Sequence, residues 1–284
     1  MNIYRKILIA IDGSKTSMHA LKEFVNFSKS YNPDITIISV IPPYDGDLNA
    51  LWVDNIDSSI KRQCDTALSD ALKIAKDADV SVSAVCEEGE IHERIVDFAD
   101  SGNYDLIVMG KKGMSLIEKA FVGSVTSRVI GYSRQDVLVI PFESKLSWDN
   151  ILIATDGSAY SEVAAMRAIE IARKYKSKIK ILSVVDVTVE FMIRAQEVYN
   201  SLVEKAKDIT NDIKARAFSL GVGAEPVVRD GEVHRVILDV ANEYKINMIV
   251  MGRLGKSGIK RLLMGSTTER VLGHTTCPVL IVKP

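Results

Sequence analysis

The stretch Lys6-Ile-Leu-Ile-Ala-Ile-Asp12-Gly-Ser14 occurs again as Asn150-Ile-Leu-Ile-Ala-Thr-Asp156-Gly-Ser158, at an offset of 144 (from Asp12 to Asp156). An apolar run that ends in Asp-Gly-Ser is typical of a buried strand followed by a turn and a helix start. A second copy so far along the chain indicates two similar halves. The 284 residues are enough for two domains of ordinary size.

Three further matches follow in the same order at an offset of 142 (from Gly89 to Gly231). They are Gly89-Glu-Ile-His92 with Gly231-Glu-Val-His234, Asp105-Leu-Ile-Val-Met-Gly110 with Asn247-Met-Ile-Val-Met-Gly252, and Gly123-Ser124 with Gly265-Ser266. The smaller offset indicates a short net deletion in the second half, which we place opposite the loop at 42–54. We predict two domains, 1–145 and 146–284, with a short linker at 143–148.

The composition is that of an ordinary globular protein, with 47% hydrophobic and 26% charged residues and a formal net charge of −1. That balance gives no sign of a nucleic-acid surface. No apolar stretch approaches the roughly 20 residues that span a bilayer, and residues 1–12 lack a signal-peptide cleavage pattern. The three cysteines are odd in number and widely spaced, so they predict neither a disulfide framework nor a zinc site. We expect a cytoplasmic protein without membrane insertion.

Apolar runs bounded by turn residues predict the strands of the first half, at 6–11, 35–41, 80–86, 106–109 and 137–140. Helical patterns lie between them: one begins near Ser14 or Ser17, one covers 57–78, and one carries apolar residues between 91 and 99. Strands that alternate with helices predict a parallel sheet with right-handed crossovers. Each half is therefore predicted to be a five-stranded, doubly wound α/β unit.

The fourth predicted strand of each half leads into glycines with one spacing, Gly-x2-Gly-x9-Gly-Ser, from Gly110 and from Gly252. Glycine lets the backbone approach an anion closely and adopt positive φ. A Gly-Ser pair that opens a helix offers N–H groups and a hydroxyl to a phosphate. These features predict a phosphate cradle in each half, and the serine is also expected to cap its helix.

Asp12 and Asp156 end the first strand of each half. Ligands of open α/β sheets bind beyond the carboxyl ends of the strands, where the strand order reverses. We infer that the first and fourth strands are neighbours, so that acid and glycines converge on one ligand. A local turn that caps the following helix is a second role for each aspartate, and the two roles are compatible.

The glycine spacing after a strand, together with Asp-Gly-Ser after the first strand, resembles the ATP-binding class of the universal stress protein family over both halves. The resemblance implies an adenine nucleotide alpha hydrolase-like fold, strand order 3-2-1-4-5 and an intrachain pseudo-dimer. It implies bound ATP or AMP, with Mg²⁺ or Mn²⁺ on the phosphates. By position it assigns nucleotide binding to Asp12, Val40, Gly110, Gly113, Gly123, Ser124 and Val125, and to Asp156, Val184, Gly252, Gly255, Gly265, Ser266 and Thr267.

The halves differ within this pattern. Leu116 stands where the second half has Gly258, and Glu118 stands where it has Lys260. An acid close to phosphate is unfavourable, so we expect the first site to bind nucleotide more weakly. The last strands of the two halves, at 137–140 and 278–282, are almost wholly apolar, and we expect each to cover the other.

We expect a nucleotide-binding stress or regulatory protein rather than a dedicated enzyme, because no general base, nucleophile pair or metal cluster accompanies the glycine loops. Two alternatives stay open. One is a slow ATPase or phosphotransferase in which Asp12 or Asp156 positions water or metal. The other is a protein-interaction module, such as a regulator of a transporter, in which the pockets are incidental. Homo-oligomers through other faces are compatible with each of these functions.

Overall fold

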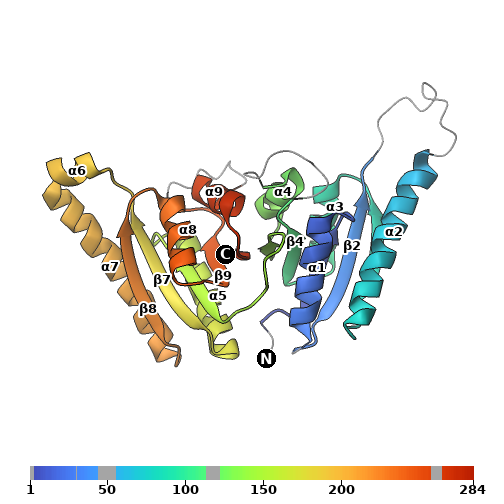
Figure 1. The fold of residues 1–284 in the computed structure, drawn as a ribbon, viewed down its shortest axis with the longest axis horizontal. Helices are drawn as coiled ribbons and strands as arrows, with labels where there is room; N and C mark the ends of the chain where they lie inside the picture. Colours follow the sequence, from blue (N-terminus) through green and yellow to red (C-terminus); the bar gives the residue numbers. More distant parts are fainter. Residues whose placement is uncertain (1–2, 30, 44–55, 113–121, 257–263) are drawn as a thin grey trace, which may run out of the picture. The chain divides into compact units, whose positions relative to one another are not determined.

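The protein is described by a computed structural model that covers residues 3–29, 31–43, 56–112, 122–256 and 264–284 (Figure 1). The chain divides into two compact units between Glu143 and Ser144. The predicted linker is partly packed, because Trp148 is buried and stacks on Tyr175, with 6.1 Å between ring centroids.

The first unit alternates strands and helices throughout the residues that the structure describes. Its elements are β1 (Lys6–Ile11), α1 (Lys15–Ser28), β2 (Asp34–Ile41), α2 (Ile56–Asp77), β3 (Ser83–Glu88), α3 (Ile91–Ser101), β4 (Leu106–Gly110), α4 (Ser124–Tyr132) and β5 (Asp136–Ile140).

The second unit repeats this series and adds a short helix, α6, before its long one. Its elements are β6 (Asn150–Ala154), α5 (Ala159–Tyr175), β7 (Lys178–Val185), α6 (Val189–Arg194), α7 (Gln196–Ser219), β8 (Ala224–Asp230), α8 (Val233–Glu243), β9 (Met248–Gly252), α9 (Ser266–His274) and β10 (Val279–Val282).

The strand order is β3-β2-β1-β4-β5 in the first unit and β8-β7-β6-β9-β10 in the second. The strand pairs whose register the structure gives are parallel, and β1 lies between β2 and β4, as β6 lies between β7 and β9. The fold class, the order 3-2-1-4-5 and the adjacency of the first and fourth strands are thereby confirmed. The order reverses beside β1 and β6, which places their carboxyl ends at the switch point of each sheet.

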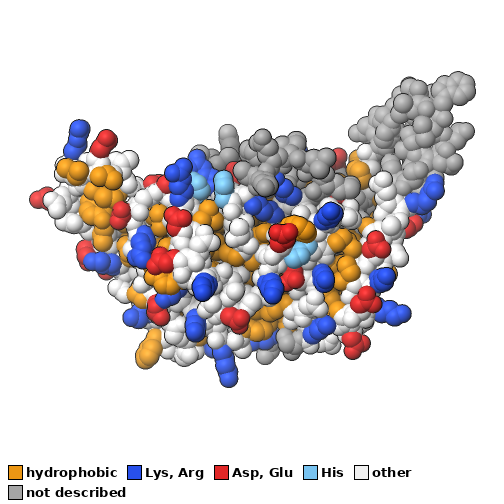
Figure 2. Space-filling view, in the orientation of Figure 1, with side chains coloured by type: hydrophobic (Ala, Val, Ile, Leu, Met, Phe, Trp, Pro, Cys, Tyr) orange, Lys and Arg blue, Asp and Glu red, His pale blue; other side chains and the backbone are white. Residues whose placement is uncertain are grey.

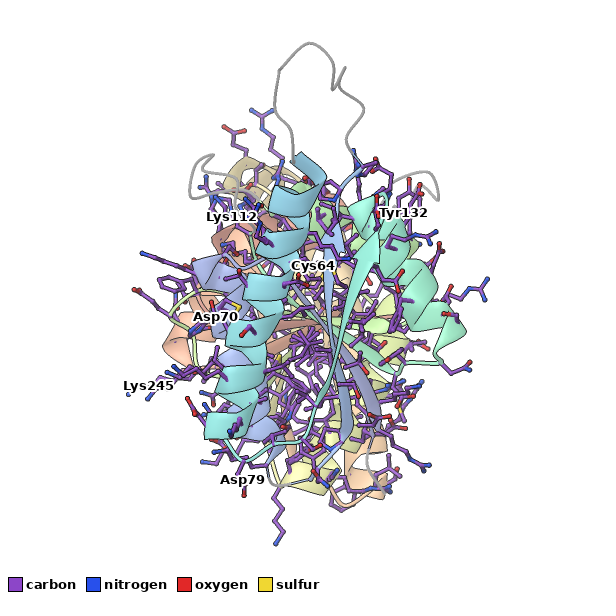
Figure 3. The ribbon with its side chains drawn as sticks, turned by 90° about the vertical axis from the view of Figure 1, so that its right-hand side faces the viewer. Cys64, Asp70, Asp79, Lys112, Tyr132 and Lys245 are labelled. Carbon is purple, nitrogen blue, oxygen red and sulfur yellow. A yellow bond between two sulfur atoms is a disulfide. The ribbon has the colours of Figure 1, made fainter. Side chains whose placement is uncertain are left out.

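Helices cover both faces of each sheet. In the first unit α1 contacts α2, and α3 contacts α4. Figure 3 shows Cys64 of α2 and Tyr132 of α4 on opposite sides of the strands. Central strands have no solvent-facing side, which is why β1 and β4 are nearly continuous apolar runs with fully buried side chains such as Ile9 and Val108.

The outermost strands β3 and β8 are more polar and more exposed than the central ones. Pro226 fits within β8 because an outermost strand has one side without a ladder to complete. The prediction of a strand at 80–86 is wrong in its bounds, since β3 covers Ser83–Glu88. The residues before Ser83 form the turn that follows α2. In this turn Asp79 adopts φ 57°, and the N–H of Val80 donates to the C=O of Ala75.

The structure corrects the cysteine prediction. A disulfide joins Cys64 of α2 to Cys86 of β3, two residues separated by 22 positions in sequence. The pair forms because α2 packs on β2 and β3, which brings the two side chains together. A count of cysteines contains no information about this packing.

No helix of the described residues is both long enough and apolar enough to cross a bilayer. Figure 2 shows exposed apolar side chains over α6 and the adjoining part of α7. Among them are Val189, Ile193 and Val198, each more than half exposed. The surface of this part of the second unit is therefore amphipathic.

Candidate functional site

Asp156 follows β6 and connects two loops at the carboxyl edge of the second sheet. Its Oδ1 accepts a hydrogen bond from the backbone N–H of Ser158 at 2.9 Å, which forms a local turn. Its Oδ2 accepts one from the backbone N–H of Lys256 at 2.7 Å, in the glycine loop after β9. The acid and the glycine loop therefore converge, and the local turn exists alongside that contact.

The charge of Asp156 is stabilised by these donors. Burial alone raises the pKa of its carboxyl group, but hydrogen bonds from Ser158, Lys256 and Ser161 outweigh burial and hold the pKa below its usual value. The side chain is therefore an ionised acceptor at neutral pH.

Two glycines of the second loop are required by close packing within the protein. A Cβ on Gly252 would lie 2.8 Å from the backbone of Tyr160, and a Cβ on Gly255 would lie 2.7 Å from Oδ2 of Asp156. Positive φ was expected at the loop glycines, and this expectation is wrong for Gly252, Gly255 and Gly265. Their role is close approach between neighbouring segments, which only a residue without a side chain allows.

Gly265 is the N-cap residue of α9, with φ −69° and no side chain to cap the helix. Serine was expected to be the cap, but Ser266 is the first helical residue, as Ser124 is in α4 after the N-cap Gly123. The start of α9 is held to the sheet by Thr268, whose hydroxyl donates to the C=O of Gly252 at 3.1 Å. This hydrogen bond holds the first turn of α9 beside the carboxyl end of β9.

A cavity of about 430 Å³ opens at this edge of the second sheet. All seven residues that the sequence assigns to the second site line it: Asp156, Val184, Gly252, Gly255, Gly265, Ser266 and Thr267. The site residues come from the ends of three neighbouring strands and from the first turn of α9. The fold thus brings together residues that are more than 100 positions apart in the chain.

The first unit repeats the local chemistry. Oδ1 of Asp12 accepts hydrogen bonds from the N–H of Ser14 at 3.0 Å and from the hydroxyl of Ser17 at 2.7 Å. Ser14 is the N-cap of α1, which selects between the two serines named from the sequence. The hydroxyl of Thr126 donates to the C=O of Gly110 at 3.1 Å, as Thr268 does to Gly252.

A cavity of about 290 Å³ lies at the equivalent edge of the first sheet. It is lined by six of the seven predicted residues: Asp12, Val40, Gly110, Gly123, Ser124 and Val125. Gly113, the seventh, lies outside the described residues, and so do Leu116 and Glu118, on which the expected weakness of the first site rests.

Both cavities have walls that the sequence motifs did not indicate. Helix α2 contributes Gln63 and Cys64 to the first cavity, and α7 contributes Lys205 and Ala206 to the second. Gln63 and Lys205, like Cys64 and Ala206, are separated by the offset of 142 that relates the glycine loops. Extending the repeat alignment through the long helices would have found these four residues.

Cations also lie near both loops. Lys112 lines the first cavity and Lys256 the second. Burial, reinforced by the charge of Lys112, lowers the pKa of Lys111 to about 8. Lys111 thus loses its charge within a pH range in which an ordinary lysine keeps it.

Comparison with known proteins agrees with this geometry. The Universal stress protein family model matches residues 3–141 and again 147–283. Universal stress protein MJ0531 of Methanocaldococcus jannaschii is 35% identical over 140 residues, 48% of this chain and 82% of its own length. Universal stress protein YxiE of Bacillus subtilis is 31% identical over 150 residues, 48% of this chain and 99% of its own.

A universal stress protein from Archaeoglobus fulgidus has a similar fold over the whole chain. Its crystal structure aligns with a TM-score of 0.76 at 20% identity and covers 99% of this chain and 98% of that one. Two matches to one family model, in tandem over nearly all residues, settle the classification. The chain belongs to the universal stress protein family and carries two domains of it.

Proposed function

We propose that each unit binds an adenine nucleotide, ATP or AMP, and that the chain is a cytoplasmic regulatory protein of the stress response whose signal is nucleotide occupancy. The observation that carries the proposal is the second cavity, which all seven predicted residues line. Its volume of about 430 Å³ falls within the range of roughly 300–1,000 Å³ that is usual for ligand pockets.

The walls of the second cavity suit the two ends of a nucleotide differently. The first turn of α9, at Ser266 and Thr267, offers N–H groups and hydroxyls to the phosphates. The opposite wall is apolar, with Val184 on β7 and Ile209 on α7, and it suits the face of a purine. Asp156 lines the same cavity, and each of its carboxylate oxygens can accept a second hydrogen bond, which suits it to a ribose hydroxyl.

A divalent cation would enter with the phosphates. Among the described residues no three His, Cys, Asp or Glu side chains are grouped to hold a metal ion. Both carboxylate oxygens of Asp156 already accept backbone hydrogen bonds. We infer that Mg²⁺ or Mn²⁺ is held mainly by phosphate oxygens and water, and that it supplies charge neutralisation.

The same hydrogen bonds bear on the alternative of ATP hydrolysis. A general base works best when its pKa lies near the operating pH, whereas the pKa of Asp156 is held below the usual value of a carboxyl group. Its oxygens orient the glycine loop instead. The arrangement therefore favours binding over catalysis in the second unit.

Substitution of Gly265 by valine tests the proposal. A Cβ at this position would meet its nearest atom, the carbonyl oxygen of Arg253, at 3.4 Å, and φ is −69°, so the fold accommodates a side chain there. The added methyl groups would occupy the space assigned to phosphate. Gly252 and Gly255 are unsuitable for this test, because a side chain at either would collide with the protein itself.

We expect Gly265→Val to abolish ATP binding to the second unit while leaving thermal unfolding nearly unchanged, as measured by calorimetry and circular dichroism. Gly223→Val is the matched control, because no atom lies within 4 Å of a Cβ at Gly223, which is outside the cavity. Mass spectrometry of nucleotide released from the purified protein identifies the ligand. Unchanged ATP affinity at the second site in the Gly265→Val protein would contradict the phosphate assignment.

A further inference from the structure

The Cys64–Cys86 disulfide reaches the wall of the first cavity through Cys64. Cys64 lines that cavity from α2 and is buried, with 4% of its surface exposed. Cys86 lies on the outermost strand β3 and is only half-buried. Figure 3 labels Cys64 on α2. The bond therefore joins a residue of the cavity wall to one that solvent reaches.

The second unit has no counterpart to this bond. Ala206 replaces Cys64 at the same position of the cavity wall. Val228 replaces Cys86, since Cys86 pairs with Ser39 on β2 as Val228 pairs with Ser183 on β7. The chain thus contains one cavity with a disulfide and one matched cavity without it.

We propose that Cys64 and Cys86 form a reversible thiol–disulfide switch that sets the nucleotide affinity of the first cavity. This inference rests on the proposed function, because it concerns regulation of that same site. Cys277, the third cysteine, is a free thiol in the second unit and takes no part.

The exchange needs a small thiol such as glutathione as reductant. A thiolate attacks Sγ of Cys86, the bond between the two cysteines breaks, and Cys64 leaves as a thiolate that takes up a proton. A second glutathione thiolate attacks the glutathione sulfur of the mixed disulfide, so glutathione disulfide forms and Cys86 leaves as a thiolate that takes up a proton. Two thiols thus lose two electrons and two protons to the protein, and glutathione disulfide oxidises it by the reverse steps.

Reduction changes the wall of the cavity because two thiol sulfurs cannot remain at bonding distance. They must separate to van der Waals contact. In the proposed switch this separation turns the side chain of Cys64 toward the cavity or moves α2 away from β3. Either movement alters the cavity wall beside Val40, because Cys86 is paired with Ser39, which directly precedes Val40 on β2. The disulfide of the oxidised form holds α2 in place, so less conformational entropy is lost when ATP binds. The oxidised form should therefore bind ATP more tightly than the reduced form.

The test measures ATP affinity at the first site alone, in the full chain carrying Gly265→Val to silence the second site. One sample is reduced with a phosphine and the other oxidised with glutathione disulfide. Mass spectrometry after alkylation counts the free thiols in each sample. We expect reduction to weaken ATP binding by about threefold to tenfold.

Three variants separate the switch from general effects of the reagents. Cys64→Ala and Cys86→Val copy the second unit, and the ATP affinity of each should no longer depend on redox state. Cys277→Ser should keep the full response. As a further control, a chain that keeps all three cysteines and has only its first site silenced by a glycine-loop substitution should show no response at its second site.

Equal ATP affinity in the two redox states, with alkylation proving that the pair had switched, would overturn the proposal. So would a response that survives in Cys86→Val, or cysteines that stay fully alkylatable after oxidation. If neither site of the unmutated chain binds ATP in either state, the proposed function fails together with this inference. Binding without a redox response overturns the switch and leaves the proposed function standing.

Discussion

Replacing Asp156 by asparagine should open the glycine loop of the second unit. The carboxylate accepts one backbone N–H with each oxygen, from Ser158 at 2.9 Å and from Lys256 at 2.7 Å. Asparagine has one carbonyl oxygen and one NH₂ group, so one of the two donors would face another donor. The hydrogen bond that joins the segment after β6 to the segment after β9 would then be lost or weakened.

The size of the effect follows from the hydrogen bond that is lost. Hydrogen bonds to charged groups contribute about 1.5–3 kcal/mol, and we take the lower end because Asp156 is only half-buried and water replaces part of the interaction. A loss of about 1.4 kcal/mol corresponds to a tenfold change in an equilibrium constant. The backbone amide of Lys256 should therefore exchange its hydrogen about tenfold faster in Asp156→Asn.

The assay is native-state hydrogen exchange read at Lys256, with Asp230→Asn as control, since Asp230 ends β8 and is exposed. The pKa of Asp156 is lower in the folded protein than in the unfolded chain, where it is about 4. The ionised carboxylate therefore stabilises the folded protein fully above about pH 4, and this stabilisation is lost as the pH falls through the lower pKa of the folded state. The two proteins should therefore converge in strong acid. Unchanged protection of Lys256 in Asp156→Asn at pH 7 would refute this reasoning.

Three further predictions concern both units. Thr268→Val leaves the buried carbonyl of Gly252 without its hydroxyl donor and should lower the free energy of unfolding by about 1–3 kcal/mol in urea titration. Thr126→Val should give a similar loss in the first unit, and no loss in either variant would contradict the anchoring role of these threonines. Lys111→Gln should stabilise the nucleotide-free protein below pH 8, where the disfavoured charge is fully present, and the gain should fade as pH rises from about 8 toward 10.5. Urea titrations at several pH values measure this, with the exposed Lys73→Gln as the control. If the last strands of the halves cover each other, as their apolar sequences predict, Leu138→Lys and Leu280→Glu should each increase protease sensitivity. The double variant should partly recover the resistance of the parent protein. Single variants as resistant as the parent would contradict this prediction.

The repeat made most of the fold predictable. Parallel pairing followed from the alternating elements, and strand order followed from the family resemblance, which also assigned the candidate site residues by position. These features depend on residues that are close in sequence or related by one offset. Asp156 and Lys256 could be expected to converge for that reason, because both follow strands that the topology makes neighbours.

What the sequence did not predict depends on contacts between elements. The bounds of β3 depend on how the chain leaves α2 at Asp79. The Cys64–Cys86 bond depends on the packing of α2 on the sheet. The need for glycine at positions 252 and 255 comes from Tyr160 and from Asp156, and neither neighbour can be identified from the spacing of the glycines alone.

Having two domains in one polypeptide changes what mutation can do to the pockets. In a homodimer of a single-domain protein, every substitution appears in both copies, so the two sites stay identical. Here Gln63 and Cys64 on α2 could diverge from Lys205 and Ala206 on α7 without any change in the other pocket. In a chain with two domains, one pocket can therefore change its wall while the residues of the other pocket stay as they are.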